Sequence, residues 1–162
     1  MASTEELLKA RRETPLERLD RNLEEMFAGL RVALPGVQVL FAFLLVLPFQ
    51  SGFPDVTAFQ EKVYFGTLLC TAMASILLIA PSARHRLRFR KGDRAYVVFT
   101  ANRLVIAGLG FLGLGMTGAI LLVSDYLFGV VPAAIATVAV GGGLLWLWFG
   151  SPLSRDAGDD LS

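Results

Sequence analysis

The sequence predicts an all-α integral membrane protein, a four-transmembrane-helix bundle with an amphipathic cytoplasmic N-terminal helix. Hydrophobic residues make up 54% of the 162 residues and charged residues only 18%, whereas a soluble domain carries about 25% charged residues. The charges are confined to the first 31 residues, a segment at 55–62, the stretch 84–103 and the end from Asp125 onward. Between them lie apolar runs long enough to cross a bilayer.

Residues 1–31 are expected to form the cytoplasmic amphipathic helical segment. Positions 14–17 (Thr-Pro-Leu-Glu) are typical of a helix N-terminus with Thr14 as the N-cap. On the polar face, Arg21 and Glu25 form an i,i+4 pair. Because a mixed-charge rather than basic segment precedes the first apolar run, we expect no cleaved signal peptide. The apolar stripe of this helix recurs at spacings of three and four: Leu16, Leu19, Leu23, Met26 and Leu30.

This apolar stripe fits three surfaces: the membrane, the rest of the protein or another copy. Helices that lie on a membrane usually carry a basic polar face. The polar face here has both signs of charge, which favours a protein partner.

A four-span membrane domain follows at 32–149, and its first span is expected at 32–49. Pro35 is expected in the first turn of that helix, and Pro48 at its far end. Gln38 interrupts the apolar run and is a candidate polar intramembrane site. Gln38 and the threonines of the second span could line a polar path or form interhelical hydrogen bonds, which is the commoner use of such residues.

The second span is expected at 63–80, after a loop at 50–61. Pro81 is expected to end this helix. Small residues at every fourth position allow two helix backbones to approach closely in lipid. Two neighbouring rows have this spacing. One is the predicted packing row Gly66, Cys70 and Ala74, and beside it lies the row Thr67, Thr71 and Ser75.

The third span is expected at 104–123 and the fourth at 131–149, separated by a turn at 124–129. Trp146 and Trp148 near the end of the fourth span are typical of a bilayer boundary. The tail at 150–162 is short, polar and expected to be disordered. At 100° per residue, the small residues of the third span fall on two different faces: Gly108, Gly115 and Gly118 on one, and Gly110, Gly113 and Thr117 on the other. This arrangement predicts a central helix that packs against neighbours on both sides.

A basic loop at 84–94 separates the two apolar halves. With four spans, it lies on the same side as both termini, and that side carries every basic residue except Lys62. The positive-inside rule therefore predicts the cytoplasmic (inner) membrane with both termini in the cytoplasm. The residues of this loop that are candidate contacts for anionic lipid headgroups or a partner are Arg84, His85, Arg86, Arg88, Arg90, Lys91 and Arg94.

Three interpretations of the basic loop stay open: a topological determinant alone, an anionic-lipid site, or a docking site for another protein. Arg31 and Arg103, at the starts of the first and third spans, are further candidate contacts. Each could reach the headgroups by snorkelling, or pair with an anionic partner inside the membrane. Nucleic-acid binding is disfavoured because the basic loop is short and lies against lipid.

The runs at 29–49 (Gly-Leu-Arg-Val-Ala-Leu-Pro-Gly-Val-Gln and onward) and 79–86 (Ile-Ala-Pro-Ser-Ala-Arg-His-Arg) resemble an actinobacterial family of uncharacterised four-span membrane proteins. That family is a domain of unknown function, and some of its members carry the label sodium:proton antiporter. The resemblance extends over residues 20–150. It implies a four-span fold and an inner-membrane location, and it implies no catalytic residues.

The residues of the four spans do not support the antiporter label. Ion coupling in a membrane normally requires an intramembrane Asp, Glu or His, and the expected spans contain none. We therefore expect a non-enzymatic structural or accessory subunit without metal or cofactor, acting as a homo-oligomer or within a larger membrane complex. The alternative is an oligomeric ion or small-solute transporter or channel.

Overall fold

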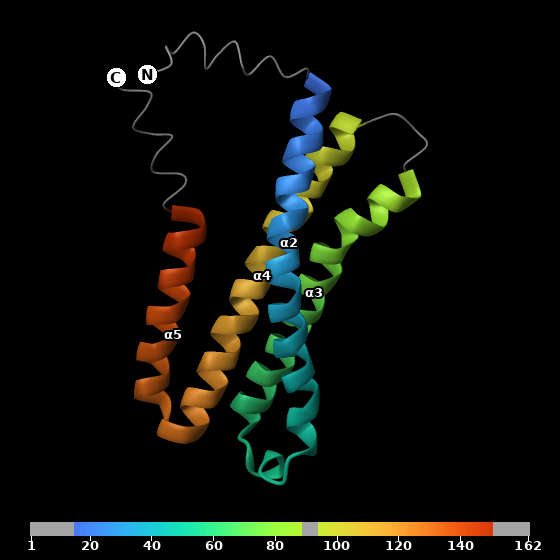
Figure 1. Ribbon diagram of the computed structural model, residues 1–162. Coiled ribbons are helices and arrows are strands. Elements are labelled where there is room, and N and C mark those ends of the chain that lie inside the picture. The colour runs from blue at the N-terminus through green and yellow to red at the C-terminus, as the bar shows by residue number, and fades with distance from the viewer. Residues whose placement is uncertain (1–14, 89–93, 151–162) are drawn as a thin grey trace, which may run out of the picture.

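The computed structural model describes residues 15–88 and 94–150, and these form long helices joined by short connections (Figure 1). Four of the helices are long and apolar enough to cross a membrane, which confirms the predicted all-α fold of a multi-pass membrane protein. The elements, labelled as in Figure 1, are α2 (Pro15–Val46), η1 (Leu47–Phe49), η2 (Phe53–Asp55), α3 (Ala58–Arg88), α4 (Arg94–Phe128), α5 (Val130–Leu145) and η3 (Trp146–Gly150).

The two ends of the bundle differ in what they carry. One end, here called the terminal end, holds Pro15, Arg88, Arg94 and Gly150 (Figure 1). The opposite end, here called the loop end, holds the connections at 47–57 and the junction of α4 with α5. At 1.5 Å per residue, α2, α3 and α4 are each roughly 45–55 Å long, which exceeds the ~30 Å hydrocarbon thickness. These three helices therefore extend beyond the apolar layer.

The amphipathic N-terminal segment and the first span form one continuous helix. α2 begins at Pro15, as the pattern at 14–17 predicts, although Thr14 itself lies outside the described residues. The predicted Arg21–Glu25 pair is confirmed, with 3.7 Å between Arg21 Nε and Glu25 Oε1. No break separates the segment ending at residue 31 from the span that follows.

The prediction that prolines delimit the first two spans is wrong for Pro35 and Pro81. Pro35 lies in the interior of α2, and Pro81 in the interior of α3, where its side chain is buried. A proline removes one helical hydrogen bond. Ending a helix in an apolar surrounding would leave several backbone groups unpaired, so continuing past the proline costs less. Pro48 lies as expected, in the 3-10 turn that follows α2.

The turn expected at 124–129 is also wrong. α4 continues to Phe128, and only Gly129 separates it from α5. Gly129 has φ of +83°, a conformation that glycine adopts without the steric cost met by other residues. Asp125 and Tyr126 are consequently helical. The expected disordered tail from residue 151 lies outside the described residues.

The helices pack unequally around α4. α3 and α4 share the most extensive interface, α2 contacts both of them, and α5 contacts α4 and the η3 turn that continues it (Figure 1). α2 faces the others with residues spaced seven apart: Leu30, Val37 and Leu44. α4 is therefore the central helix, as its two sets of small residues predict.

Candidate functional site

The α3–α4 interface is formed where three glycines of α4 meet bulkier side chains of α3. A Cβ atom added at Gly108 would lie 2.7 Å from Leu78 Cδ2, and one at Gly115 would lie 2.7 Å from Thr71 Cγ2. A Cβ atom at Gly118 would overlap the hydroxyl of Thr67. Since non-bonded carbon atoms rest ~3.5–4.0 Å apart, all three positions lack room for a larger residue.

The second face of α4 contacts α5 more loosely. A Cβ atom added at Gly141 of α5 would lie 3.2 Å from Thr117 Cγ2, and one at Gly113 would lie 3.9 Å from the Trp148 ring. Beside these contacts an apolar groove of about 540 Å³ runs between the two helices. Its lining is Ala107, Gly110, Phe111, Gly113, Leu114, Thr117, Gly141, Leu144, Leu145 and Trp148.

Of the two small-residue rows of α3, the one that meets the glycines of α4 is the row of Thr67 and Thr71 rather than the row of Gly66. Gly66 is exposed, and an added Cβ atom would meet nothing within 4 Å among the described residues. Cys70 is half-buried and Ala74 is fully buried. The surface of α3 that meets α4 is the neighbouring one, on which Thr67 and Thr71 are buried. The periodicity was sound, but spacing along one helix does not fix which of two adjacent rows meets the neighbour.

The hydroxyl groups in the middle of the bundle bond to their own helices. Thr71 Oγ1 donates to Leu68 O at 2.9 Å, and Thr117 Oγ1 donates to Gly113 O at 2.8 Å. The same pattern, with a carbonyl four residues earlier as acceptor, holds for Thr67, Ser75 and Thr137. These groups satisfy their donors within one helix, as isolated hydroxyls in lipid must.

A polar cluster links the first and second hairpins at the loop end. Thr57 and Gln60 cap the start of α3 reciprocally: Thr57 N–H donates to Gln60 Oε1 at 2.9 Å, and Gln60 N–H donates to Thr57 Oγ1 at 3.3 Å. Gln60 Nε2 also donates to Asp125 Oδ2 at 2.9 Å. Gln60 is buried, so its amide uses both ends to hold α3 against the end of α4. The Thr-x-x-Gln spacing was a readable signal for the cap, whereas nothing in the sequence indicated Asp125.

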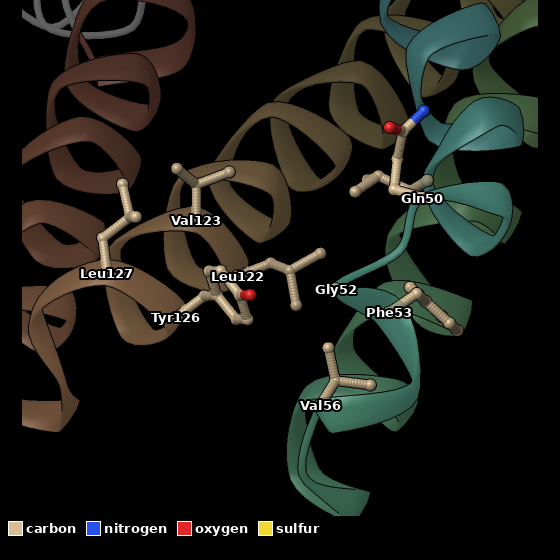
Figure 2. Close-up of a pocket in the computed structure, with 9 residues that line it drawn as sticks. Gln50, Gly52, Phe53, Val56, Leu122, Val123, Tyr126 and Leu127 are labelled. Carbon is tan, nitrogen blue, oxygen red and sulfur yellow. The ribbon is translucent and has the colours of Figure 1, made fainter.

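A second set of contacts surrounds Tyr64 near the same end. Its hydroxyl donates to Leu44 O at 3.0 Å, and its ring meets Phe53 edge to face with centroids 5.2 Å apart. Beside them lies a cavity of about 310 Å³ between the η1–η2 connection and the end of α4 (Figure 2). Figure 2 shows Leu122 and Tyr126 directed toward Gly52 across this cavity. Its lining is Leu47, Gln50, Gly52, Phe53, Val56, Leu122, Val123, Tyr126 and Leu127.

Comparison with known proteins assigns this chain to a family. A model described as a family of unknown function, DUF6328, matches residues 12–152 and so includes all four apolar helices. The chain belongs to DUF6328. No curated protein and no solved structure matches it. The expected membership of an uncharacterised family is confirmed, and the match carries no activity with it.

The basic residues predicted to contact lipid headgroups or a partner lie at the terminal end of the bundle or outside the described residues of this DUF6328 protein. Arg31 and Arg103 are exposed on α2 and α4. The span containing Arg103 begins at Thr100 rather than at residue 104, so this arginine lies within the apolar helix. Of the basic loop, positions 90 and 91 lie outside the described residues, and the side chains at 84–88 and 94 are not described.

Gln38 lies on the exposed side of α2 and not inside the bundle. It has no side-chain hydrogen bond within residues 15–88 and 94–150. In the same ranges no three His, Cys, Asp or Glu side chains gather as a metal site would require. The polar groups that the structure does bring together are those of the loop-end cluster, Thr57, Gln60 and Asp125.

Proposed function

We propose that this DUF6328 protein is a non-enzymatic subunit of the cytoplasmic membrane that acts by lateral association, with copies of itself or within a larger complex. The observation that carries the proposal is how little of the outer helices the chain covers. Within an 18-residue apolar stretch, only 6% of the residues are buried in Val130–Trp148 and 11% in Glu24–Phe49. Among the described elements, α5 contacts only α4 and the short η3 turn that continues it. Helices in lipid associate largely through packing, and these two helices have most of their surface available for it.

The engagement of the polar groups favours association over transport of a polar solute. The hydroxyls of Thr67, Thr71, Ser75, Thr117 and Thr137 donate to carbonyls of their own helices. The groove between α4 and α5 is lined by apolar side chains and glycines, apart from Thr117. A transported ion would need ligands that replace its water shell, and the described spans offer it few.

The proposed orientation has both termini in the cytoplasm. It is supported by the position of Arg88, Arg94 and the start of α2 at one end of the bundle, together with the basic loop between them. To test it, Cys70 is replaced by serine and a single cysteine is introduced at Phe53 or at Gly150. A membrane-impermeant thiol reagent should label Phe53→Cys in intact cells and Gly150→Cys only after lysis. The reverse pattern would refute the orientation.

We further propose that the basic loop, with Arg31 and Arg103, contacts anionic headgroups. Each Lys or Arg near an anionic surface contributes about 1 kcal/mol of attraction. Lipids that co-purify with the protein should therefore be enriched in anionic species relative to the host membrane. Replacing Arg84, Arg86, Arg88 and Arg90 by glutamine should remove that enrichment, and an unchanged lipid profile would count against the contact.

Extraction into a mild detergent, followed by size measurement with light scattering, tests the association itself. The protein should elute at a multiple of its 17.6 kDa mass or together with a defined partner. A single 17.6 kDa species in detergent, with no energy transfer between labelled copies in native membranes, would refute the proposed function.

A further inference from the structure

We propose that α2 pairs with α2 of a second copy of this chain through a seam centred on Gln38. The inference rests on the proposed function and deepens it, because it names the partner and the residue that selects it. It begins from an exposed amide in the middle of the apolar span at 32–49.

The depth of Gln38 in the membrane follows from its place in α2. The candidate span ends at Phe49, eleven positions after Gln38. Eleven residues rise roughly 16 Å, which is about half of the hydrocarbon thickness. The side chain of Gln38 is therefore near the mid-plane, where it cannot reach headgroups or water.

The orientation of Gln38 directs its amide away from the rest of the chain. The face of α2 that packs on α3 and α4 carries Leu30, Val37 and Leu44, and Gln38 lies one step of 100° from that face. It is exposed and makes no side-chain hydrogen bond to any described residue. Its oxygen and its two N–H groups would thus face lipid in a monomer, although hydrocarbon offers them no partner.

Residues on the same side of α2 form a seam with the spacing of a helix pair. Starting at Pro35, positions recur at alternating intervals of three and four, and all are exposed: Pro35, Gln38, Ala42 and Leu45. This alternation is the pattern by which two helices interdigitate. Ala42 follows the amide by one turn, and its small side chain lets two backbones approach. Arg31 precedes the seam, and its long side chain can turn outward to the headgroups.

A second copy fits this seam better than a different protein because of symmetry. Two copies inserted with the same orientation are related by a twofold axis along the membrane normal, which brings equal positions to equal depth. An amide has both a donor and an acceptor, so two Gln38 side chains at the axis can bond to each other. A single polar residue within an apolar helix seam also fixes the register and the number of helices that associate.

Disulfide trapping in native membranes tests the seam with the full-length chain. In the Cys70→Ser background, Ala42→Cys should form a disulfide-linked dimer on mild oxidation. Phe43→Cys, an adjacent exposed position off the seam, should remain at background. Adding Gln38→Leu to the Ala42→Cys chain should reduce the dimer, while Gln38→Asn, which keeps the amide, should restore part of it. Equal trapping at Ala42→Cys and Phe43→Cys would overturn the proposal.

Energy transfer between labelled copies in vesicles gives the size of the effect. Interhelical hydrogen bonds in membranes are modest, so Gln38→Leu should weaken the dimer about three- to thirtyfold. Val39→Leu, an exposed neighbour of the seam, should leave the dissociation constant unchanged. An oligomer that is insensitive to Gln38→Leu would overturn the seam and leave the proposed function standing. A monomer in both assays would overturn both, and capture of a different protein through Gln38 would overturn the second copy as its partner.

Discussion

Substitution of Gly115 by alanine is expected to separate α3 from α4. The added methyl group would lie 2.7 Å from Thr71 Cγ2, well inside the ~3.5–4.0 Å at which carbon atoms rest. Thr71 is fully buried, and its hydroxyl donates to Leu68 O at 2.9 Å. The side chain therefore cannot rotate away without losing that hydrogen bond, and the helices must move apart instead.

The magnitude follows from two opposing terms. Overpacking a close contact costs about 1–3 kcal/mol, while replacing a helix-interior glycine by alanine stabilises by roughly 0.5–1 kcal/mol. Gly110 is the matched control, because it lies in the same helix and an added Cβ atom would meet nothing within 4 Å. Gly115→Ala should thus be less stable than Gly110→Ala by about 1–3 kcal/mol.

Reversible unfolding in mixed micelles, followed by circular dichroism as the SDS fraction rises, measures this difference. A second substitution identifies the cause: Thr71→Ser removes Cγ2 and keeps the hydroxyl, so it should restore most of the stability lost in Gly115→Ala. The double-mutant cycle should give a favourable coupling between the two changes. Equal stability of Gly115→Ala and Gly110→Ala would refute the close α3–α4 contact.

Three further substitutions test the loop end by the same unfolding assay. Asp125→Ala removes the hydrogen-bond acceptor of the buried Gln60 side chain and should cost about 1–3 kcal/mol. Asp55→Ala, at an exposed carboxylate, should be neutral. Tyr64→Phe loses its hydrogen bond to an α2 carbonyl and should cost about 0.5–1.5 kcal/mol. Tyr126→Phe, at a half-exposed residue, serves as the control, and equal losses would contradict the bond. Gly129→Ala, at φ of +83° and ψ of −178°, should cost about 1–3 kcal/mol through backbone strain alone, and an unchanged midpoint would show that the junction adopts another conformation.

The central position of α4 could be predicted from the sequence because glycine spacing alone divides a helix into faces. Gly108, Gly115 and Gly118 do lie against α3, and Gly113 lies on the other side, against Trp148 of η3. Which α3 residues they meet could not be predicted, since periodicity allowed the row of Gly66 as readily as that of Thr67. Contacts between distant positions have no signal in a single sequence.

The ends of the helices were predicted less well than their number. The behaviour of proline in soluble proteins predicts helix ends at Pro35 and Pro81, but the structure continues both helices through these residues. In lipid, the loss of one hydrogen bond is smaller than the loss of several at a helix end. Likewise, the Gln60–Asp125 hydrogen bond joins residues 65 positions apart, and only the folded arrangement brings them together.

The internal bonding of the α3 threonines bears on how the chain is assembled during synthesis. α3 leaves the ribosome before α4, yet its longest interface is with α4. Until α4 is inserted, the surface that carries Thr67 and Thr71 faces lipid. Because both hydroxyls donate to carbonyls of α3 itself, α3 exposes no unpaired hydroxyl donor on that surface. These two hydroxyls therefore need no partner from outside α3 before the glycine face of α4 covers them.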